Sequence, residues 1–340
     1  MSTKITPGKI KGMQAVANER GVIAAAAMDQ RGSLQSAIAK DKGIDKKAVT
    51  PEMMSEFKEA VVRILTPHAS AILLDPEFGL KAAKMRSKNA GLLLAYERSG
   101  YDNTQPGRLP DLLDDYSVRR IQEAGADCVK ILLYYTPFDP AKTNEIKHAW
   151  VERIGDECRA CDIPFFLEFI GYEEGVDEKG IEFARKKPEC VTRSMEEFSK
   201  DRYGVDVMKV EVPINMAFVA GARSCKGDSA YSRDEAKGHF RKSASVAKKP
   251  FIYLSAGVSN DTFSETLDLA SEAGVNFSGV LCGRATWKDG MPIYAKQGIK
   301  ALEDWLNVQG VKNIKNVNDR LTAAKPWYAF YGASSPAGVA

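Results

Sequence analysis

The sequence predicts a single α/β domain with the fold of a (β/α)8 TIM barrel, and two observations support that prediction. Eight short apolar runs of strand type recur along the 340 residues, and most gaps between them carry apolar residues at helical spacing. A doubly wound sheet normally has fewer strands and often a glycine-rich first turn, which this sequence lacks. Eight β-then-α units without a linker-like change of composition therefore favour one closed barrel.

The strand predictions depend on apolar runs that end in polar or turn-forming residues. Between them, Ser259 suits the N-cap of a helix, and Gly125 and Gly274 suit helix C-termini shortly before the next run. The eight runs are residues 22–28, 69–74, 91–95, 128–134, 164–170, 207–212, 250–254 and 277–281. We accordingly expect a lead-in segment that packs on the barrel (1–21), the barrel (22–306) and a partly mobile C-terminal extension (307–340).

The composition excludes several classes of function. A net charge of +3 without a basic block interleaved with aromatic residues does not predict nucleic-acid binding. No stretch approaches 18 uninterrupted apolar residues, so we expect no membrane association. The Cys158–Cys161 pair has no second pair at zinc spacing and lies at the end of a helical run. We interpret the six cysteines as reduced thiols and expect a cytoplasmic protein.

Lys209 is the most unusual residue of the sequence, because it interrupts the apolar strand-like run Asp-Val-Met-Lys-Val-Glu-Val-Pro (206–213). Burial of an unpaired ammonium costs several kcal/mol. Lys209 therefore either pairs with a strand-end carboxylate such as Glu211, or is kept partly neutral for chemistry. An ordinary lysine of pKa ~10.4 is a free amine in only about one molecule in 2,500 near pH 7. Burial and a neighbouring cation would increase that fraction and allow attack on a carbonyl carbon.

Two neighbouring runs also place one ionisable residue in an apolar stretch, namely Lys130 in the fourth and Glu168 in the fifth. Asp29 follows the first run. If all of these side chains point inward, they meet Lys209 in one cavity and each lysine has a carboxylate partner. We expect excess positive charge there to lower the pKa of at least one lysine. A purely structural network of paired charges is the alternative.

The last two runs end in residues that suit phosphate binding. In (β/α)8 barrels the loops after strands seven and eight commonly hold phosphate. Ser255 offers a hydroxyl, Gly257 and Gly283 allow close approach of backbone N–H groups, and Arg284 can bind a phosphate through two nitrogens. The alternative is that the glycines simply end strands and Arg284 is a surface charge.

The histidines do not suggest a metal centre. His68, His148 and His239 lie in different segments, none at ligand spacing from another. A zinc site that polarises a ketone is therefore not expected, and an amine that forms an iminium ion can supply the same electron sink.

Five segments together resemble the class I tagatose-1,6-bisphosphate aldolase family over about residues 22–305. They are AMDQRG (27–32), LDPEFGL (74–80), GLLLAYE (91–97), KVEVP (209–213) and GVLCGRATW (279–287). The resemblance implies a metal-independent enzyme that needs no cofactor and acts on a phosphorylated ketose, and we expect a homo-oligomer. It also implies that Lys209 forms the Schiff base and that Glu168 is the acid/base, with Lys130 and Asp29 as charged neighbours. The residues implied around the phosphate of the dihydroxyacetone-phosphate half are Gln30, Arg31, Ser255, Gly257, Gly283 and Arg284.

Three questions stay open at the level of sequence. The same mechanism could act on fructose 1,6-bisphosphate or on a sulfonated ketose phosphate. A catalytically idle, phosphometabolite-binding regulator could also use this barrel, although it would not need a buried lysine. Finally, Tyr328 or Tyr331 of the C-terminal aromatic segment could assist proton transfer, or the segment could simply dock on the barrel or on a neighbouring subunit.

Overall fold

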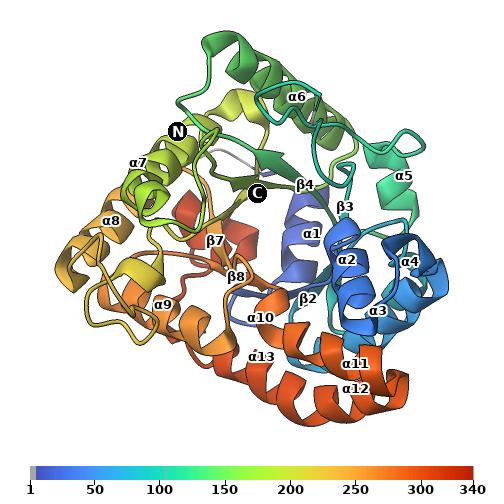
Figure 1. The fold of residues 1–340 in the computed structure, drawn as a ribbon. Coiled ribbons are helices and arrows are strands. Elements are labelled where there is room, and N and C mark those ends of the chain that lie inside the picture. The colour runs from blue at the N-terminus through green and yellow to red at the C-terminus, as the bar shows by residue number, and fades with distance from the viewer. Residues whose placement is uncertain (1–4, 103, 340) are drawn as a thin grey trace.

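The computed structural model describes residues 5–102 and 104–339, which form a closed barrel of eight parallel strands in chain order, as the sequence predicts (Figure 1). The predicted runs and the observed strands agree to within two residues at either end. Pro164 and Pro250 stay outside their strands because proline has no N–H to donate to a ladder. The strands are β1 (Ile23–Ala27), β2 (Ala71–Leu74), β3 (Gly91–Ala95), β4 (Cys128–Tyr134), β5 (Phe165–Ile170), β6 (Val207–Val210), β7 (Phe251–Leu254) and β8 (Gly279–Cys282).

Helices surround the barrel and follow the predicted rhythm. The hydroxyl of Ser259 accepts a hydrogen bond from Thr262 N at the start of α9, as expected, and Gly125 and Gly274 have positive φ angles of 93° and 70° just after helices. The helices are α1 (Pro7–Val16), α2 (Gly32–Lys42), α3 (Pro51–Leu65), α4 (Leu80–Ala83), α5 (Val118–Glu123), α6 (Ala141–Ala160), α7 (Ile181–Phe198), α8 (Arg233–Ser245), α9 (Asn260–Glu272), α10 (Arg284–Trp287), α11 (Met291–Gln297), α12 (Ile299–Trp305) and α13 (Val311–Asn318).

The interior of the barrel is filled by apolar side chains from all eight strands, and each strand contributes one of them to the layer just below the carboxyl ends. Because side chains alternate across a strand, these residues point inward while their neighbours pack against the helices. The inward layer has small residues on β1 and β3 and large ones on β5 and β7. Its members are Ala27, Leu73, Ala95, Cys128, Phe166, Val207, Ile252 and Leu281.

The two ends of the described chain close the barrel at the N-terminal ends of the strands. Met13 and Val16 of α1 and Trp327 of the C-terminal segment pack into the same buried cluster as the interior layer. Trp327 N donates to the carbonyl of Gly21, two residues before β1. Residues 1–4 of the predicted lead-in and residue 340 of the tail lie outside the described part of the chain.

The described residues of the predicted extension, 307–339, include helical elements that pack against the rest of the chain. A π-helical turn, Leu306–Gly310, leads into α13, which packs against α9 and α10. A short 3₁₀ turn, Trp327–Tyr331, then reaches the closed end of the barrel. Partial mobility of this extension stays a prediction. No helix in the described ranges combines the length and apolarity that a membrane span needs.

Candidate active site

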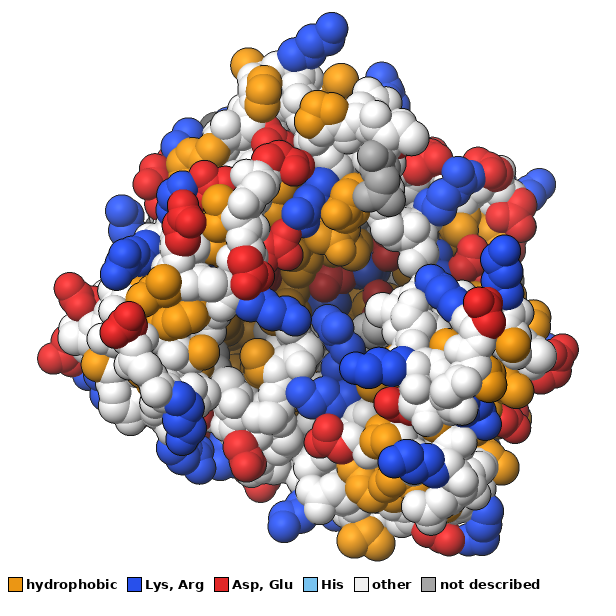
Figure 2. All heavy atoms as spheres, in the orientation of Figure 1, with side chains coloured by type: hydrophobic (Ala, Val, Ile, Leu, Met, Phe, Trp, Pro, Cys, Tyr) orange, Lys and Arg blue, Asp and Glu red, His pale blue; other side chains and the backbone are white. Residues whose placement is uncertain are grey.

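A layer of charged side chains lies one step above the apolar interior, toward the carboxyl ends of the strands. Side chains two positions apart on a strand point to the same side. The residue two positions after the apolar inward residue therefore also points inward, and in β1 to β6 or directly after them that residue is ionisable. Figure 2 shows a central hollow on this face, with acidic and basic side chains at its floor and basic ones around its rim. The six residues are Asp29, Asp75, Glu97, Lys130, Glu168 and Lys209.

Lys130 lies at the centre of this layer and is fully buried. Its Nζ is 2.9 Å from Asp29 Oδ2, 3.0 Å from Glu97 Oε1 and 2.8 Å from Glu168 Oε2. Burial lowers the pKa of a lysine, but the three carboxylates outweigh burial and raise the pKa of Lys130 well above its ordinary value. For this lysine the expected lowering is wrong, because the site surrounds it with negative rather than positive charge.

Lys209 is paired with Glu168, its direct register partner on the neighbouring strand. Lys209 Nζ lies 2.8 Å from Glu168 Oε2, the same oxygen that binds Lys130, and the residue is only 4% exposed. The alternative partner Glu211 points elsewhere: it binds Lys187 Nζ at 3.0 Å and accepts a hydrogen bond from Gly171 N. Each lysine thus has a carboxylate partner, as the sequence predicts.

Two of the carboxylates that face the lysines, Glu168 and Asp29, are held in the ionised form. For Glu168, burial raises the pKa, but Lys130 and Lys209 outweigh it and the net shift is downward. For Asp29 the same balance against Lys130 and Lys209 also places the pKa below its ordinary value. At neutral pH both groups are therefore proton acceptors.

The loops after β7 and β8 contact each other beside this layer. Ser255 is buried, and Gly257 has a φ of 76°, where a side chain would be strained. A Cβ built on Gly257 would lie 2.8 Å from Arg284 Cζ, so the exposed Arg284 extends across the glycine. A Cβ on Gly283 would lie 2.9 Å from the carbonyl oxygen of Ala27. The structure thus brings together the four residues that the sequence assigned to phosphate binding.

Gln30 and Arg31 follow Asp29 at the end of β1 and line the same layer. Gln30 Nε2 donates to Asp29 Oδ1 at 3.1 Å, and Arg31 Nη2 donates to the carbonyl of Glu97 at 2.8 Å. Three buried polar atoms here have no hydrogen-bond partner among the described residues: Gln30 Oε1, Arg31 Nη1 and Glu97 Oε2. Unpartnered buried polar atoms are rare in folded proteins, so these three favour a polar ligand in the hollow.

Comparison with known proteins identifies the family. The model of the DeoC/LacD family aldolases matches residues 23–289, a range that contains all eight strands. The chain belongs to this family. A protein named tagatose 1,6-diphosphate aldolase from Listeria monocytogenes serotype 4a (strain HCC23) is 52% identical over 332 residues, which are 97% of this chain and 96% of the relative.

Solved structures of aldolases share the fold of this family member. A fructose-bisphosphate aldolase from Plasmodium falciparum matches with a TM-score of 0.65 and 13% identity over 97% of this chain and 96% of that chain. A Schiff base forming fructose-1,6-bisphosphate aldolase matches with a TM-score of 0.52 and 16% identity over 88% of this chain and 99% of that chain. At such low identity these likenesses support the barrel alone.

The sequence assignments did not include three residues that the aldolase places in this layer or directly behind it. Glu97 binds Lys130, and Asp75 binds the buried Lys58 of α3. Glu97 and Asp75 were detectable in principle, because both lie two residues beyond an inward apolar residue, the same step that separates Cys128 from Lys130. Lys58 carries no such signal, because it belongs to a helix.

The C-terminal tyrosines of the aldolase lie away from this layer. A Cβ on Gly21, which precedes β1, would be 2.6 Å from the ring of Tyr328, and Tyr331 packs with the cluster at the closed end of the barrel. Burial, together with Asp206 and Asp201, raises the pKa of Tyr331. Of the two expectations for this segment, docking on the barrel agrees with the structure.

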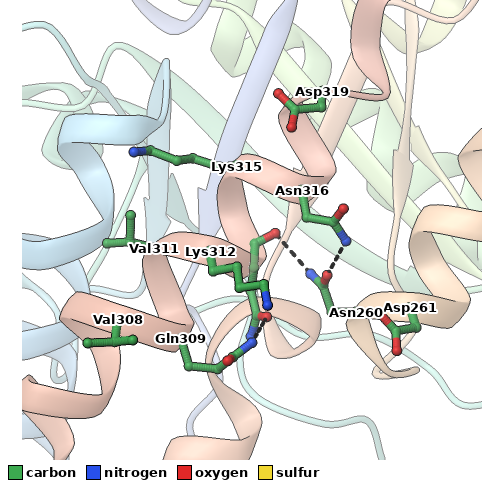
Figure 3. A pocket seen from close by; sticks show the side chains of 10 residues that line it. Asn260, Asp261, Val308, Gln309, Val311, Lys312, Lys315, Asn316 and Asp319 are labelled. Atoms are coloured by element: carbon green, nitrogen blue, oxygen red, sulfur yellow. Dashed lines mark hydrogen bonds between the residues drawn. The ribbon is translucent and has the colours of Figure 1, made fainter.

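Two hollows on the outer surface differ in character from the barrel mouth. One, of about 720 Å³, lies between α9 and α13 (Figure 3). Its amides satisfy one another: Asn260 Nδ2 donates to the carbonyl of Asn313, and Asn316 Nδ2 donates to Asn260 Oδ1. The other, of about 460 Å³, lies between α6 and α7. Within the described residues, no group of three or more His, Cys, Asp or Glu side chains is arranged to hold a metal ion.

Proposed function

We propose that this family member is a class I aldolase that reversibly cleaves tagatose 1,6-bisphosphate to dihydroxyacetone phosphate and glyceraldehyde 3-phosphate through a Schiff base on Lys209. The observation that carries the proposal is the shared oxygen: Glu168 Oε2 lies 2.8 Å from both Lys209 Nζ and Lys130 Nζ. A buried amine, a carboxylate in contact with it and a second, fixed cation are the groups that this chemistry requires. The name of the 52% identical relative supports the choice of sugar.

Formation of the Schiff base begins with the transfer of a proton from Lys209. Glu168 is within hydrogen-bond distance and, as a carboxylate, can accept that proton. The free amine of Lys209 attacks the ketone carbon to give a carbinolamine. Glu168 then returns its proton to the departing hydroxyl, so that loss of water gives a protonated imine and restores the carboxylate. This imine replaces the metal ion of other aldolases as the electron sink.

Cleavage then needs a base at the hydroxyl of C4. Glu168, again as carboxylate, removes the hydroxyl proton while the C3–C4 bond breaks and the aldehyde half leaves. The electron pair of that bond neutralises the iminium and gives an enamine. Protonation of the enamine at carbon and addition of water release dihydroxyacetone phosphate and restore the amine. Lys130 stays charged throughout, because three carboxylates raise its pKa, and it holds Glu168 in place.

The remaining predicted residues support binding of a phosphorylated, polyhydroxylated substrate. Ser255, Gly257, Gly283 and Arg284 offer a hydroxyl, room for backbone approach and a guanidinium for one phosphate. The unpartnered Gln30 Oε1 and Glu97 Oε2 can accept hydrogen bonds from sugar hydroxyls, and Arg31 Nη1 can donate one.

Trapping with borohydride tests the proposal. Incubation with dihydroxyacetone phosphate followed by reduction converts the imine into a stable secondary amine, which mass spectrometry locates. We expect the adduct on the peptide that contains Lys209, and we expect neither adduct nor turnover in Lys209→Ala. Full activity of Lys209→Ala, or an adduct on another lysine, would contradict the assignment.

A second measurement decides the sugar and separates an enzyme from a regulator. We expect kcat/KM to be highest for tagatose 1,6-bisphosphate in a comparison with fructose 1,6-bisphosphate and a sulfonated ketose phosphate. A higher value for another sugar would keep the mechanism and change the substrate. Tight binding of a bisphosphate without turnover would instead favour the non-catalytic regulator.

A further inference from the structure

Lys58 is a fully buried lysine behind the active site. It belongs to α3, outside the strands, and its side chain reaches the carboxyl ends of β1 and β2. Its Nζ donates to the carbonyl oxygens of Met28 at 2.7 Å and Gln30 at 2.8 Å, and to Asp75 Oδ2 at 2.5 Å. An ammonium has three protons, and here each has an acceptor.

The two carbonyls that Lys58 binds belong to the residues on either side of Asp29. One ammonium thus holds the peptide group that precedes Asp29 and the peptide group that follows Gln30. The side chain of Asp29 in turn binds Lys130 Nζ through Oδ2 and accepts from Gln30 Nε2 through Oδ1. A lysine that served only to neutralise Asp75 would not need these two carbonyl contacts.

We propose that Lys58 is a positioning residue of the aldolase: it fixes the backbone at the end of β1 so that Asp29 meets Lys130, and Asp75 holds the ammonium in place. The inference deepens the proposed function and depends on it, because it assigns a role through Asp29 at the same site. Asp75 contributes in two ways, since its Oδ1 also accepts from Phe78 N at 2.9 Å and its carboxylate is therefore fixed on both sides.

The charged groups around Asp29 and Lys58 determine how removal of Lys58 changes the pKa of Asp29. Asp29 is faced by Lys130 from β4, Lys209 from β6 and Lys58 from α3, and these cations outweigh burial and lower its pKa. Lys58 is faced by Asp75 and Asp29, which favour its charge, and by Arg31, which opposes it; burial dominates and lowers its pKa. Loss of Lys58 removes one of three cations from Asp29 and raises the pKa of that carboxyl.

A matched pair of double variants separates positioning from charge compensation. Lys58→Met/Asp75→Asn removes the buried pair without leaving an unpaired charge, and such replacements are often neutral for stability. Lys58→Gln/Asp75→Asn has the same charge but keeps an N–H donor near the two carbonyls. Lys84→Met, at an exposed lysine after α4, controls for loss of a lysine charge.

We expect kcat of the Lys58→Met/Asp75→Asn variant to fall about 10- to 100-fold, the range typical when a residue that orients a metal ligand is mutated. The Gln variant should recover part of this loss. In both, the acid limb of the pH profile of kcat/KM should move to higher pH. Borohydride should still trap dihydroxyacetone phosphate on Lys209, because the amine is intact.

Two results overturn the proposal. One is a Lys58→Met/Asp75→Asn variant with the kcat and pH profile of the parent, which would make Lys58 a partner of Asp75 and nothing more. The other is equal loss in the Met and Gln variants with an unmoved acid limb, which would indicate a general disturbance of the fold. Failure of the proposed function is distinguishable from both, because it shows in the parent enzyme as absence of the Lys209 adduct.

Discussion

Glu168 and Lys209 are register partners on β5 and β6, and Glu168 Oε2 lies 2.8 Å from Lys209 Nζ. Because neighbouring parallel strands fix this pairing through the backbone, no loop movement is needed to bring the carboxylate to the amine. The same oxygen also binds Lys130 from β4. A change at Glu168 therefore affects both lysines, in addition to the proton transfers that we propose for its carboxylate.

Replacement of Glu168 by glutamine should separate imine formation from cleavage. The amide keeps the shape but cannot accept the hydroxyl proton, so we expect kcat for cleavage to fall about 10²- to 10⁴-fold, the usual contribution of a general base. Borohydride should still label Lys209, although more slowly. Glu211→Gln removes another carboxylate from the same region of the barrel, one that binds Lys187, and should leave far more activity. Equal losses in the two variants would argue against the role of Glu168.

Replacement of Lys130 by methionine should change the pH dependence. Lys130 lowers the pKa of Asp29 and of Glu168, so its loss raises both, and the acid limb of kcat/KM should move to higher pH. In the parent, the depressed pKa values of these carboxyls stabilise the fold at any pH above the unfolded-state pKa of about 4. This stabilisation is lost as the pH falls through the lower pKa values of the folded state.

Thermal unfolding across the acid range provides the second measurement for Lys130→Met. The variant should lose less stability than the parent on acidification. Its carboxyl pKa values are less depressed, so it takes up fewer protons than the parent when it unfolds in the acid range. Lys142→Met, at an exposed lysine of α6, is the control and should follow the parent in both profiles. An acid limb that stays in place would show that neither Asp29 nor Glu168 governs it.

Replacement of Arg284 by alanine should weaken substrate binding more than it slows chemistry. Arg284 crosses Gly257 between the two phosphate-type loops, whereas we propose that the proton transfers take place at Glu168. Loss of a hydrogen bond to a charged group costs about 1.5–3 kcal/mol, so KM should rise about 10- to 100-fold. Inhibition by inorganic phosphate should weaken in parallel. Arg153→Ala, on the exposed side of α6, should change neither quantity.

The closed end of the barrel should govern stability and not catalysis. Trp327 is fully buried against the interior layer, so Trp327→Ala should destabilise the fold by about 3–5 kcal/mol, measured by denaturant unfolding. Val308→Ala, at a residue that is 73% exposed, should stay within about 0.5 kcal/mol of the parent.

Substitutions of the C-terminal tyrosines test the same division of labour at the level of activity. We expect Tyr328→Phe and Tyr331→Phe to keep kcat, because both side chains pack at the closed end of the barrel. A large drop in kcat for either variant, with normal trapping on Lys209, would instead indicate that the segment reaches the site during turnover.

The strands and the buried ionisable residues of this protein could be predicted from the sequence for a simple physical reason. A buried parallel strand reads as an apolar run, so the eight strands could be placed, and an ionisable residue such as Lys209 inside such a run is conspicuous. Contacts that join a helix to a strand end have no comparable signature. Lys58 is an ordinary-looking lysine of an amphipathic helix, and only the fold shows that it reaches the carbonyl of Met28.

The charge balance around Lys130 was also beyond the reach of the sequence. Its pKa depends on how many carboxylates lie within about 3 Å. The sequence can mark Glu97 as an inward residue, but its contact with Lys130 became known only with the register of β3 against β4. The sequence placed two lysines together and therefore suggested an excess of positive charge. The structure adds Glu97 to Asp29 and Glu168, and the sign of the shift reverses.

The two-residue step between the apolar interior and the charged layer restricts how this enzyme can diverge. Insertion or deletion of one residue within β6 would exchange its inward and outward faces and turn the amine of Lys209 toward the helices. A change of that kind would remove the proposed nucleophile from the site, whereas changes in loop residues outside the charged layer and the phosphate-type loops would leave Lys209 in place. Descendants of this barrel can therefore change their sugar specificity through their loops while they keep Lys209 at the same place in the barrel.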